Sequence, residues 1–184
     1  MKEQFKMALF KTDYSNINQN DYSALPTGEY EMVINKASEN ATPNGAETFQ
    51  VDLVVRNDLS NVAELAETNG KYKNRHVFND NWKRKSGKFQ GQYQLDDLQH
   101  ILMAAKVPEG TEINSMKEFA DAITGKPVRV YVKKQFSEYR GEDENQVAPW
   151  NYSETQFPVL NHKFDKKQPT SDETIQIPDD DMPF

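Results

Sequence analysis

The chain has 184 residues, a formal net charge of −7 and no cysteine. This length is enough for one domain with a buried core and an additional tail. The absence of cysteine excludes disulfides, thiol catalysis and zinc sites made of cysteine, and it is compatible with a reducing cytoplasm. Because no apolar run approaches the length of a membrane span and no signal peptide is recognisable, we expect a cytoplasmic protein without a membrane partner.

The charge is unevenly distributed along the chain. Residues 165–184 contain six acids and two bases, which leaves a net charge of −3 on the rest of the chain. Residues 71–88 contain seven bases and a single acid, Asp80. A local charge of +6 in a nearly neutral body indicates a basic patch that suits a polyanionic partner.

Three strands are predicted in the first half of the chain. Residues 1–26 have no clear pattern, and we assign them to an N-terminal extension. Residues 58–70 are polar and predict a surface loop, and a third strand is expected over about residues 72–79. The first two strands form a hairpin with one buried face, which is indicated by alternating apolar side chains at Tyr30, Met32, Ile34, Phe49, Val51, Leu53 and Val55.

Two short helices follow the third strand. The sequence Ser115-Met116-Lys117-Glu118 is a capping box, in which the Ser hydroxyl and the Glu carboxylate each accept a backbone N–H. It opens the second helix, whose inward residues are expected to be Phe119, Ala122 and Ile123. The first helix is predicted from apolar residues at three- and four-residue steps, namely Leu95, Leu98, Ile101, Leu102 and Ala105.

Two more strands complete the predicted sheet. Valines at 128, 130 and 132 alternate with outward residues, a polar hairpin tip covers residues 137–145, and a last strand runs over about residues 146–155. We therefore predict a mainly β fold with two short helices over residues 27–164. The strand plan is that of an OB-fold, a five-stranded antiparallel Greek-key barrel with its helical segment between strands 3 and 4. A generic five-stranded α+β sheet fits the same pattern.

Single-stranded DNA is held by cations along the phosphates and by aromatic rings that stack on bases. Residues 71–89 interleave both kinds of side chain. Phe78 fits a core residue better than a stacking one, Tyr72 and Trp150 fit either role, and the outward face of residues 129–133 could be merely solvated. The candidate binding residues are Lys71, Tyr72, Lys73, Arg75, Trp82, Lys83, Arg84, Lys85, Lys88, Arg129, Tyr131, Lys133, Trp150 and Tyr152.

The sequence contains no residue pattern that is typical of an enzyme active site. His76, His100 and His162 are far apart and have no metal-binding spacing. Asp96 and Asp97 are better explained by the dipole of the first helix than by acid–base catalysis. There is no glycine-rich phosphate loop or nucleophile elbow. We therefore expect no catalytic residues, no metal and no cofactor.

Residues 165–184 are polar and acidic, and they predict a disordered tail. Its last six residues form a tip with three carboxylates, a short apolar segment and a terminal Phe. The tip resembles the C-terminal interaction peptide of bacterial and phage single-stranded-DNA-binding proteins, in which Ile or Leu is usual at position 182. The resemblance implies that replication and recombination proteins bind the tip, which consists of Asp179, Asp180, Asp181, Met182, Pro183 and Phe184.

Four further segments carry a wider resemblance: residues 28–30, 54–58, 72–78 and 125–130. They are similar to a family of phage proteins of formerly unknown function, found mainly in phages of Gram-positive bacteria. The resemblance implies sequence-nonspecific single-stranded DNA binding in phage DNA replication and recombination, in the host cytoplasm. Analogy with OB-folds adds a possible homo-oligomer, a dimer or a tetramer. The alternative is an adaptor or inhibitor that binds a host DNA-repair or replication protein through the tip, without binding DNA.

Overall fold

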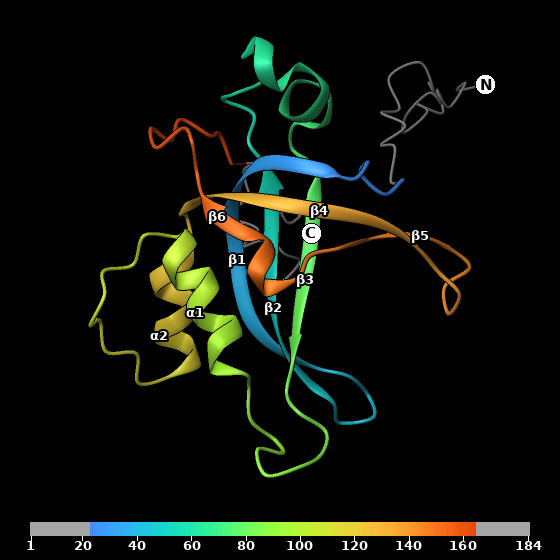
Figure 1. Cartoon of the computed structure of the whole chain (residues 1–184), viewed down its shortest axis with the longest axis vertical. Coiled ribbons are helices and arrows are strands. Elements are labelled where there is room, and N and C mark those ends of the chain that lie inside the picture. Colours follow the sequence, from blue (N-terminus) through green and yellow to red (C-terminus); the bar gives the residue numbers. More distant parts are fainter. Residues whose placement is uncertain (1–22, 165–184) are drawn as a thin grey trace, which may run out of the picture.

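The computed structural model describes residues 23–164 (Figure 1), so residues 1–22 and the predicted tail with its tip lie outside the described part. The helical elements are η1 (Ala63–Leu65), the π-helix η2 (Ala66–Gly70), α1 (Leu95–Ala104), α2 (Met116–Ile123) and η3 (Pro149–Asn151). The strands are β1 (Gly28–Ala41), β2 (Glu47–Val55), β3 (His76–Trp82), β4 (Pro127–Ser137), β5 (Glu142–Gln146) and β6 (Tyr152–Glu154). The expectation of a mainly β fold is confirmed.

The strands form one antiparallel sheet in the order β3-β2-β1-β4-β5, and β6 pairs with the first part of β4. The long strand β1 lies at its centre, because its first half pairs with β4 and its second half pairs with β2. A bulge between Ile34 and Lys36 interrupts the pairing with β2, and bulges bend a strand. The sheet is open, with β3 and β5 as its edges, so a closed barrel is not observed.

The core lies inside the curved sheet and beneath the two α-helices. The alternation predicted for β1 and β2 is confirmed, since the seven apolar side chains that predicted the hairpin are all buried. Figure 1 shows α1 and α2 side by side on one flank of the sheet, away from the β4–β5 hairpin. They add Leu98, Ile101, Phe119 and Ile123 to the core. Leu95, which was expected in the apolar stripe, is 70% exposed.

The capping box of α2 is present in a modified form. The Ser115 Oγ accepts the backbone N–H of Glu118 at 3.1 Å, as predicted. The Glu118 carboxylate, however, accepts the N–H of Asn114 at 2.9 Å, where the sequence predicted the N–H of Ser115. The donor of the reciprocal hydrogen bond therefore lies one residue earlier in the chain than predicted, and the bond still stabilises the first turn of the helix.

The third strand begins later than predicted. Tyr72 continues the helical segment that begins with η2, and the turn before β3 is formed by Lys73 and Asn74; Asn74 has a positive φ of 65°, a conformation that Asn tolerates better than most residues. The polar tip predicted over residues 137–145 is shorter than expected, because β5 occupies its second half, and the last strand predicted over residues 146–155 is reduced to β6 after η3. At the N-terminal boundary, Leu25 is buried and its N–H donates to Asn145 Oδ1 at 2.8 Å. The domain thus includes residues that the sequence placed in the extension.

A buried polar network holds the end of the domain. The Arg56 side chain is fully buried and forms an ion pair with Asp58 at 2.7 Å. It also donates to the carbonyl oxygens of Phe157 and Val159, each at 2.7 Å. A little further along, Asn57 donates to the carbonyl of Lys163 at 2.9 Å. Segment 156–164 is therefore tied to the residues that follow β2, which lie beside the start of β3.

Candidate nucleic-acid interface

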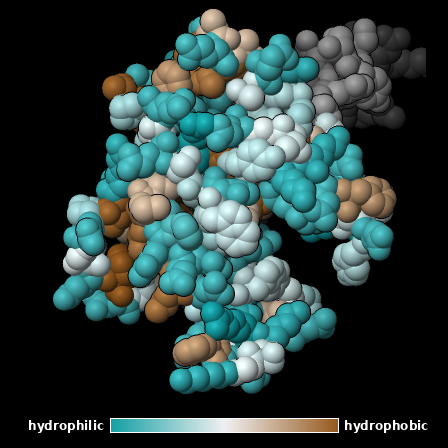
Figure 2. Space-filling model, in the orientation of Figure 1, coloured by the Kyte–Doolittle hydropathy of each residue, from teal (hydrophilic) through white to brown (hydrophobic). Residues whose placement is uncertain are grey.

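A groove of about 1050 Å³ lies between β3 and β5, the two edges of the open sheet. Figure 2 shows the surface hollowed between the projecting β4–β5 hairpin and the main body. One wall is formed by residues 75–80 and Trp82, and the other by residues 142–148 of β5 and the segment after it. Trp150 and Lys133 also belong to the lining. The groove exists because the two strands approach each other without forming a backbone ladder.

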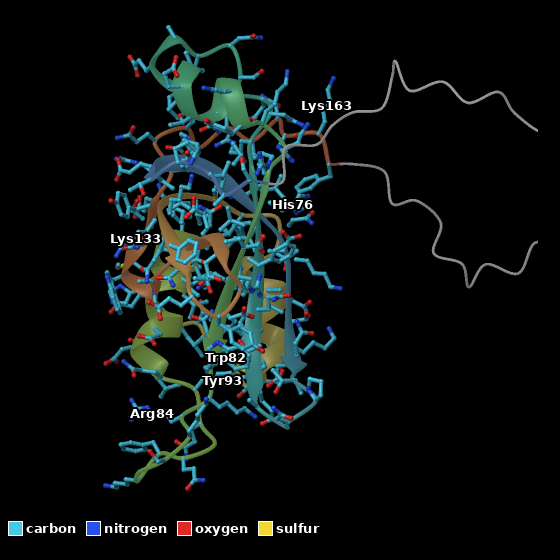
Figure 3. All side chains as sticks on the ribbon, turned by 90° about the vertical axis from the view of Figure 1, so that its right-hand side faces the viewer. His76, Trp82, Arg84, Tyr93, Lys133 and Lys163 are labelled. Carbon is cyan, nitrogen blue, oxygen red and sulfur yellow. The ribbon has the colours of Figure 1, made fainter. Side chains whose placement is uncertain are left out.

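Aromatic rings line this groove. Phe78 and Trp82 lie on the outward face of β3, where they are 54% and 45% exposed, and Trp150 of η3 is 69% exposed. The His76 ring stacks near Phe78, with centroids 6.1 Å apart and planes inclined by 19°. Figure 3 shows His76 and Trp82 at different levels of the molecule, with Lys133 to one side. Exposed rings in a groove are the feature that base stacking requires.

The floor of the groove is closed by side-chain hydrogen bonds. Asn79, on the inward face of β3, donates to the carbonyl of Val147 at 2.8 Å and accepts from the Tyr152 hydroxyl at 2.9 Å. Tyr152 is buried, and burial raises the pKa of its hydroxyl, which stays a neutral donor. The sequence-based assignment of Tyr152 to base stacking is therefore wrong, because its ring belongs to the core.

The charges on the groove walls are largely balanced. Lys134 pairs with Asp143 at 3.0 Å and Arg140 pairs with Glu144 at 3.8 Å. Lys133 has no ion pair within residues 23–164. The groove therefore provides more ring surface than net positive charge, and Lys133 and Arg75 are the candidate bases that line it.

The predicted basic patch is split into two clusters at opposite ends of β3. Lys71 and Lys73 precede the strand, and the basic loop (residues 83–91) follows it. Seven residues of strand at about 3.4 Å each place the clusters roughly 20 Å apart. The rings lie between them, an arrangement that suits a strand whose phosphates meet cations on both sides of its stacked bases.

The basic loop has its own aromatic side chain. Phe89 is exposed, and the cationic groups of Arg84 and Lys88 lie 5.2 and 5.5 Å from the centre of its ring. Lys83 is less available to a phosphate than the other bases of the loop, because its ammonium group forms an ion pair with Glu47 at 2.5 Å. Backbone hydrogen bonds join the two ends of the loop, from the Arg84 N–H to the carbonyl of Gln92 at 3.0 Å and from the Gly91 N–H to the carbonyl of Arg84 at 2.8 Å. Lys85 is exposed in the same loop.

The remaining candidates lie apart from the groove. Tyr72 is half-buried against the core, with the Lys71 ammonium 5.5 Å from its ring centre. Arg129 forms an ion pair with Glu29, and Tyr131 is exposed on the same outward face of β4. These residues do not line the groove. The structure thus brings together Arg75, Trp82, Lys133 and Trp150 out of the candidates.

Sequence reasoning missed three groove residues on β3. Phe78 was assigned to the core, and neither His76 nor Asp80 was considered for binding, yet all three face outward with Trp82. Their even spacing was a usable signal, since residues two apart share one face of a strand.

The described residues meet neither the requirements of a metal site nor those of a membrane-spanning helix. Within residues 23–164, no three His, Asp or Glu side chains are placed to hold a metal ion together. Within the same residues, no helix has the length and apolar character needed to cross a bilayer.

Comparison with known proteins identifies a family. No curated protein matches the chain. A family model described as "Protein of unknown function (DUF669)" matches residues 10–165, which covers the whole groove and most of the chain. The chain therefore belongs to the DUF669 family of proteins of unknown function.

Proposed function

We propose that the protein binds single-stranded DNA with little sequence preference, as part of phage DNA replication and recombination. The observation that carries the proposal is the set of exposed rings in one groove. Phe78, Trp82 and Trp150 line it from two sides, and exposed apolar side chains that gather in one groove are typical of a ligand-binding site. Stacking contributes about 1–3 kcal/mol per base, so three rings suffice for useful affinity.

The positions of the cations support the same proposal. A chain with a net charge of −7 would not attract DNA as a whole. The exposed bases, however, flank the rings, with Lys71 and Lys73 at one end of β3 and the basic loop at the other. Counterion release by a few such contacts gives non-specific binding that weakens with salt.

A partly open OB-fold is the proposed architecture of the domain. Its support is the order β3-β2-β1-β4-β5, with a helical segment between β3 and β4. The open edges also approach each other, since Asn79 of β3 bonds to Val147 just after β5. OB-folds bind oligonucleotides on the face of strands 2–3 and on the loops after strands 1 and 4, and the groove shares β3 and the β4–β5 connection with that surface.

The predicted tip is proposed to recruit replication and recombination proteins. An acidic segment with a terminal carboxylate suits a basic pocket on a partner. The tip lies outside the described residues, so its support is the sequence alone. Formation of a dimer or tetramer also stays a prediction, which size-exclusion chromatography with light scattering would test.

The proposal is tested by titrating labelled oligo-dT at several salt concentrations. The logarithm of the affinity should fall linearly with the logarithm of salt, with a slope of about −0.7 per neutralised phosphate. Replacing Phe78, Trp82 or Trp150 singly by Ala should weaken binding about 5- to 150-fold each, which corresponds to one lost stacking contact.

Phe136→Ala is the matched control, since Phe136 is also exposed but does not line the groove. It should leave the affinity unchanged. Absence of binding at low salt would overturn the proposal and favour the adaptor that works through its tip alone. Equal losses in Phe136→Ala and Phe78→Ala would show that the groove is not the binding site.

A further inference from the structure

Asp80 is an acid placed among the rings of the groove. It lies between Phe78 and Trp82 on the outward face of β3, two residues from each. Alternate residues of a strand are about 7 Å apart, so a base stacked on either ring has its edge within reach of this carboxylate. An acid at this position is unexpected in a site for a polyanion, and it calls for a role other than phosphate binding.

The Asp80 carboxylate is held in place from one side. Its Oδ1 accepts from Gln50 Nε2 at 3.1 Å and from Thr48 Oγ1 at 3.4 Å. Gln50 is fixed in turn, because its Oε1 accepts from Asn40 at 3.2 Å. These side-chain hydrogen bonds connect β1, β2 and β3 and fix the orientation of the Asp80 carboxylate, which can accept further hydrogen bonds.

The other oxygen of Asp80 is available. Within residues 23–164, Oδ2 has no hydrogen-bond partner and no cation pairs with the carboxylate. On the opposite wall, Asp143 and Glu144 are occupied by Lys134 and Arg140. Asp80 is therefore an anchored acid with a free acceptor at the rings.

We propose that Asp80 gives the groove a preference for bases that carry an exocyclic amino group. An ionised carboxylate can only accept hydrogen bonds. Cytosine presents an amino donor at the position where thymine and uracil present a carbonyl oxygen, and a carboxylate is the natural acceptor for that donor. A carbonyl facing Asp80 would place two acceptors together and leave both unsatisfied.

This inference rests on the proposed function, and it adds a base preference to binding that otherwise tolerates any sequence. The test compares oligo-dC with oligo-dU of equal length, since the two bases differ at the amino-bearing edge and neither has a methyl group. Fluorescence anisotropy is measured on the full chain at neutral pH, where cytosine is uncharged. Wild-type protein should bind oligo-dC at least about tenfold more tightly, which is the lower end of the effect of one hydrogen bond to a charged group.

The test variant is Asp80→Asn, which keeps the shape of the side chain but can both donate and accept. Because the anchored oxygen still accepts from Gln50, the free position becomes an N–H donor, so the dC/dU affinity ratio should fall to one or below, chiefly by strengthening binding to oligo-dU. Glu142→Gln is the matched control, because it removes the same charge from the groove wall at a carboxylate without anchoring hydrogen bonds. It should strengthen binding to both oligomers equally and keep the ratio of wild type.

The outcomes separate the two proposals. If neither oligomer binds wild-type protein, the proposed function fails. If both bind with equal affinity, or if Asp80→Asn keeps the wild-type ratio while its circular dichroism is native, the base preference alone is overturned.

Discussion

Asn79 is the side chain that joins the two open edges of the sheet, and replacing it by Ala should destabilise the fold. The substitution leaves the buried Tyr152 hydroxyl and the carbonyl of Val147 without their partners. Each unsatisfied buried group costs about 1–3 kcal/mol, so we expect a loss of about 3 kcal/mol in the free energy of unfolding. Asn81 is less affected, because its amide still donates to the carbonyl of Phe49 at 3.1 Å.

Tyr152→Phe should cost only about 1 kcal/mol, because Asn79 Oδ1 still accepts from Asn81 at 3.1 Å. The double variant has no Tyr152 hydroxyl that could be left unpaired. The sum of the losses in the two single variants should therefore exceed the loss in the double variant. The assay is urea unfolding followed by the fluorescence of Trp82 and Trp150. Tyr139→Phe is the control, since Tyr139 is 98% exposed and should be neutral. A loss below 1 kcal/mol for Asn79→Ala, or strictly additive effects, would refute the reasoning.

Two further predictions concern Asp58 and Leu25. Burial raises the pKa of Asp58, but hydrogen bonds from Arg56 and the N–H of Asn161 outweigh it and hold the pKa below its ordinary value. The stability that this carboxylate contributes is complete above about pH 4 and is lost as pH falls through the lowered pKa. Asp58→Asn should therefore lower the free energy of unfolding by about 3 kcal/mol at pH 7 and flatten its fall below pH 4 in urea titrations; parallel curves for the two proteins would contradict this. Leu25→Ala should cost about 3 kcal/mol in the same assay, whereas Leu95→Ala at an exposed site should cost almost nothing. Equal effects at the two leucines would show that residue 25 is not part of the core.

The sequence predicted most of the scaffold, because the pattern and the burial agree in β1, β2, β4 and α2. It failed where the inward side of a strand is polar. In β3 the inward residues after Val77 are Asn79 and Asn81, while Phe78 and Trp82 face outward. The rule that apolar side chains point inward therefore assigns Phe78 to the wrong face. The two amides are satisfied by the carbonyl of Val147, just after β5, and by that of Phe49 on the neighbouring strand β2, and the alternation along the sequence does not reveal these partners.

The candidate site was predicted in part for a related reason. The residue types for DNA binding were recognised along residues 71–89, but their division by β3 into two clusters depends on where the strand begins and ends. The opposite wall of the groove comes from β5, some sixty residues later in the chain, and its acidic composition gave no sign of a binding surface. Tyr152 and Trp150 are two residues apart, but η3 ends between them, and they point to different environments.

Both limits of the described chain lie near the same end of the groove. Ser23 accepts a hydrogen bond from Arg75, and Asn57 links Lys163 to Asn74 at 2.9 and 2.8 Å. The chain also lacks cysteine, so one introduced thiol would be unique. A fluorophore on Phe164→Cys would therefore stand near Asn57 and the turn that precedes β3, where its emission is expected to report the arrival of an oligonucleotide.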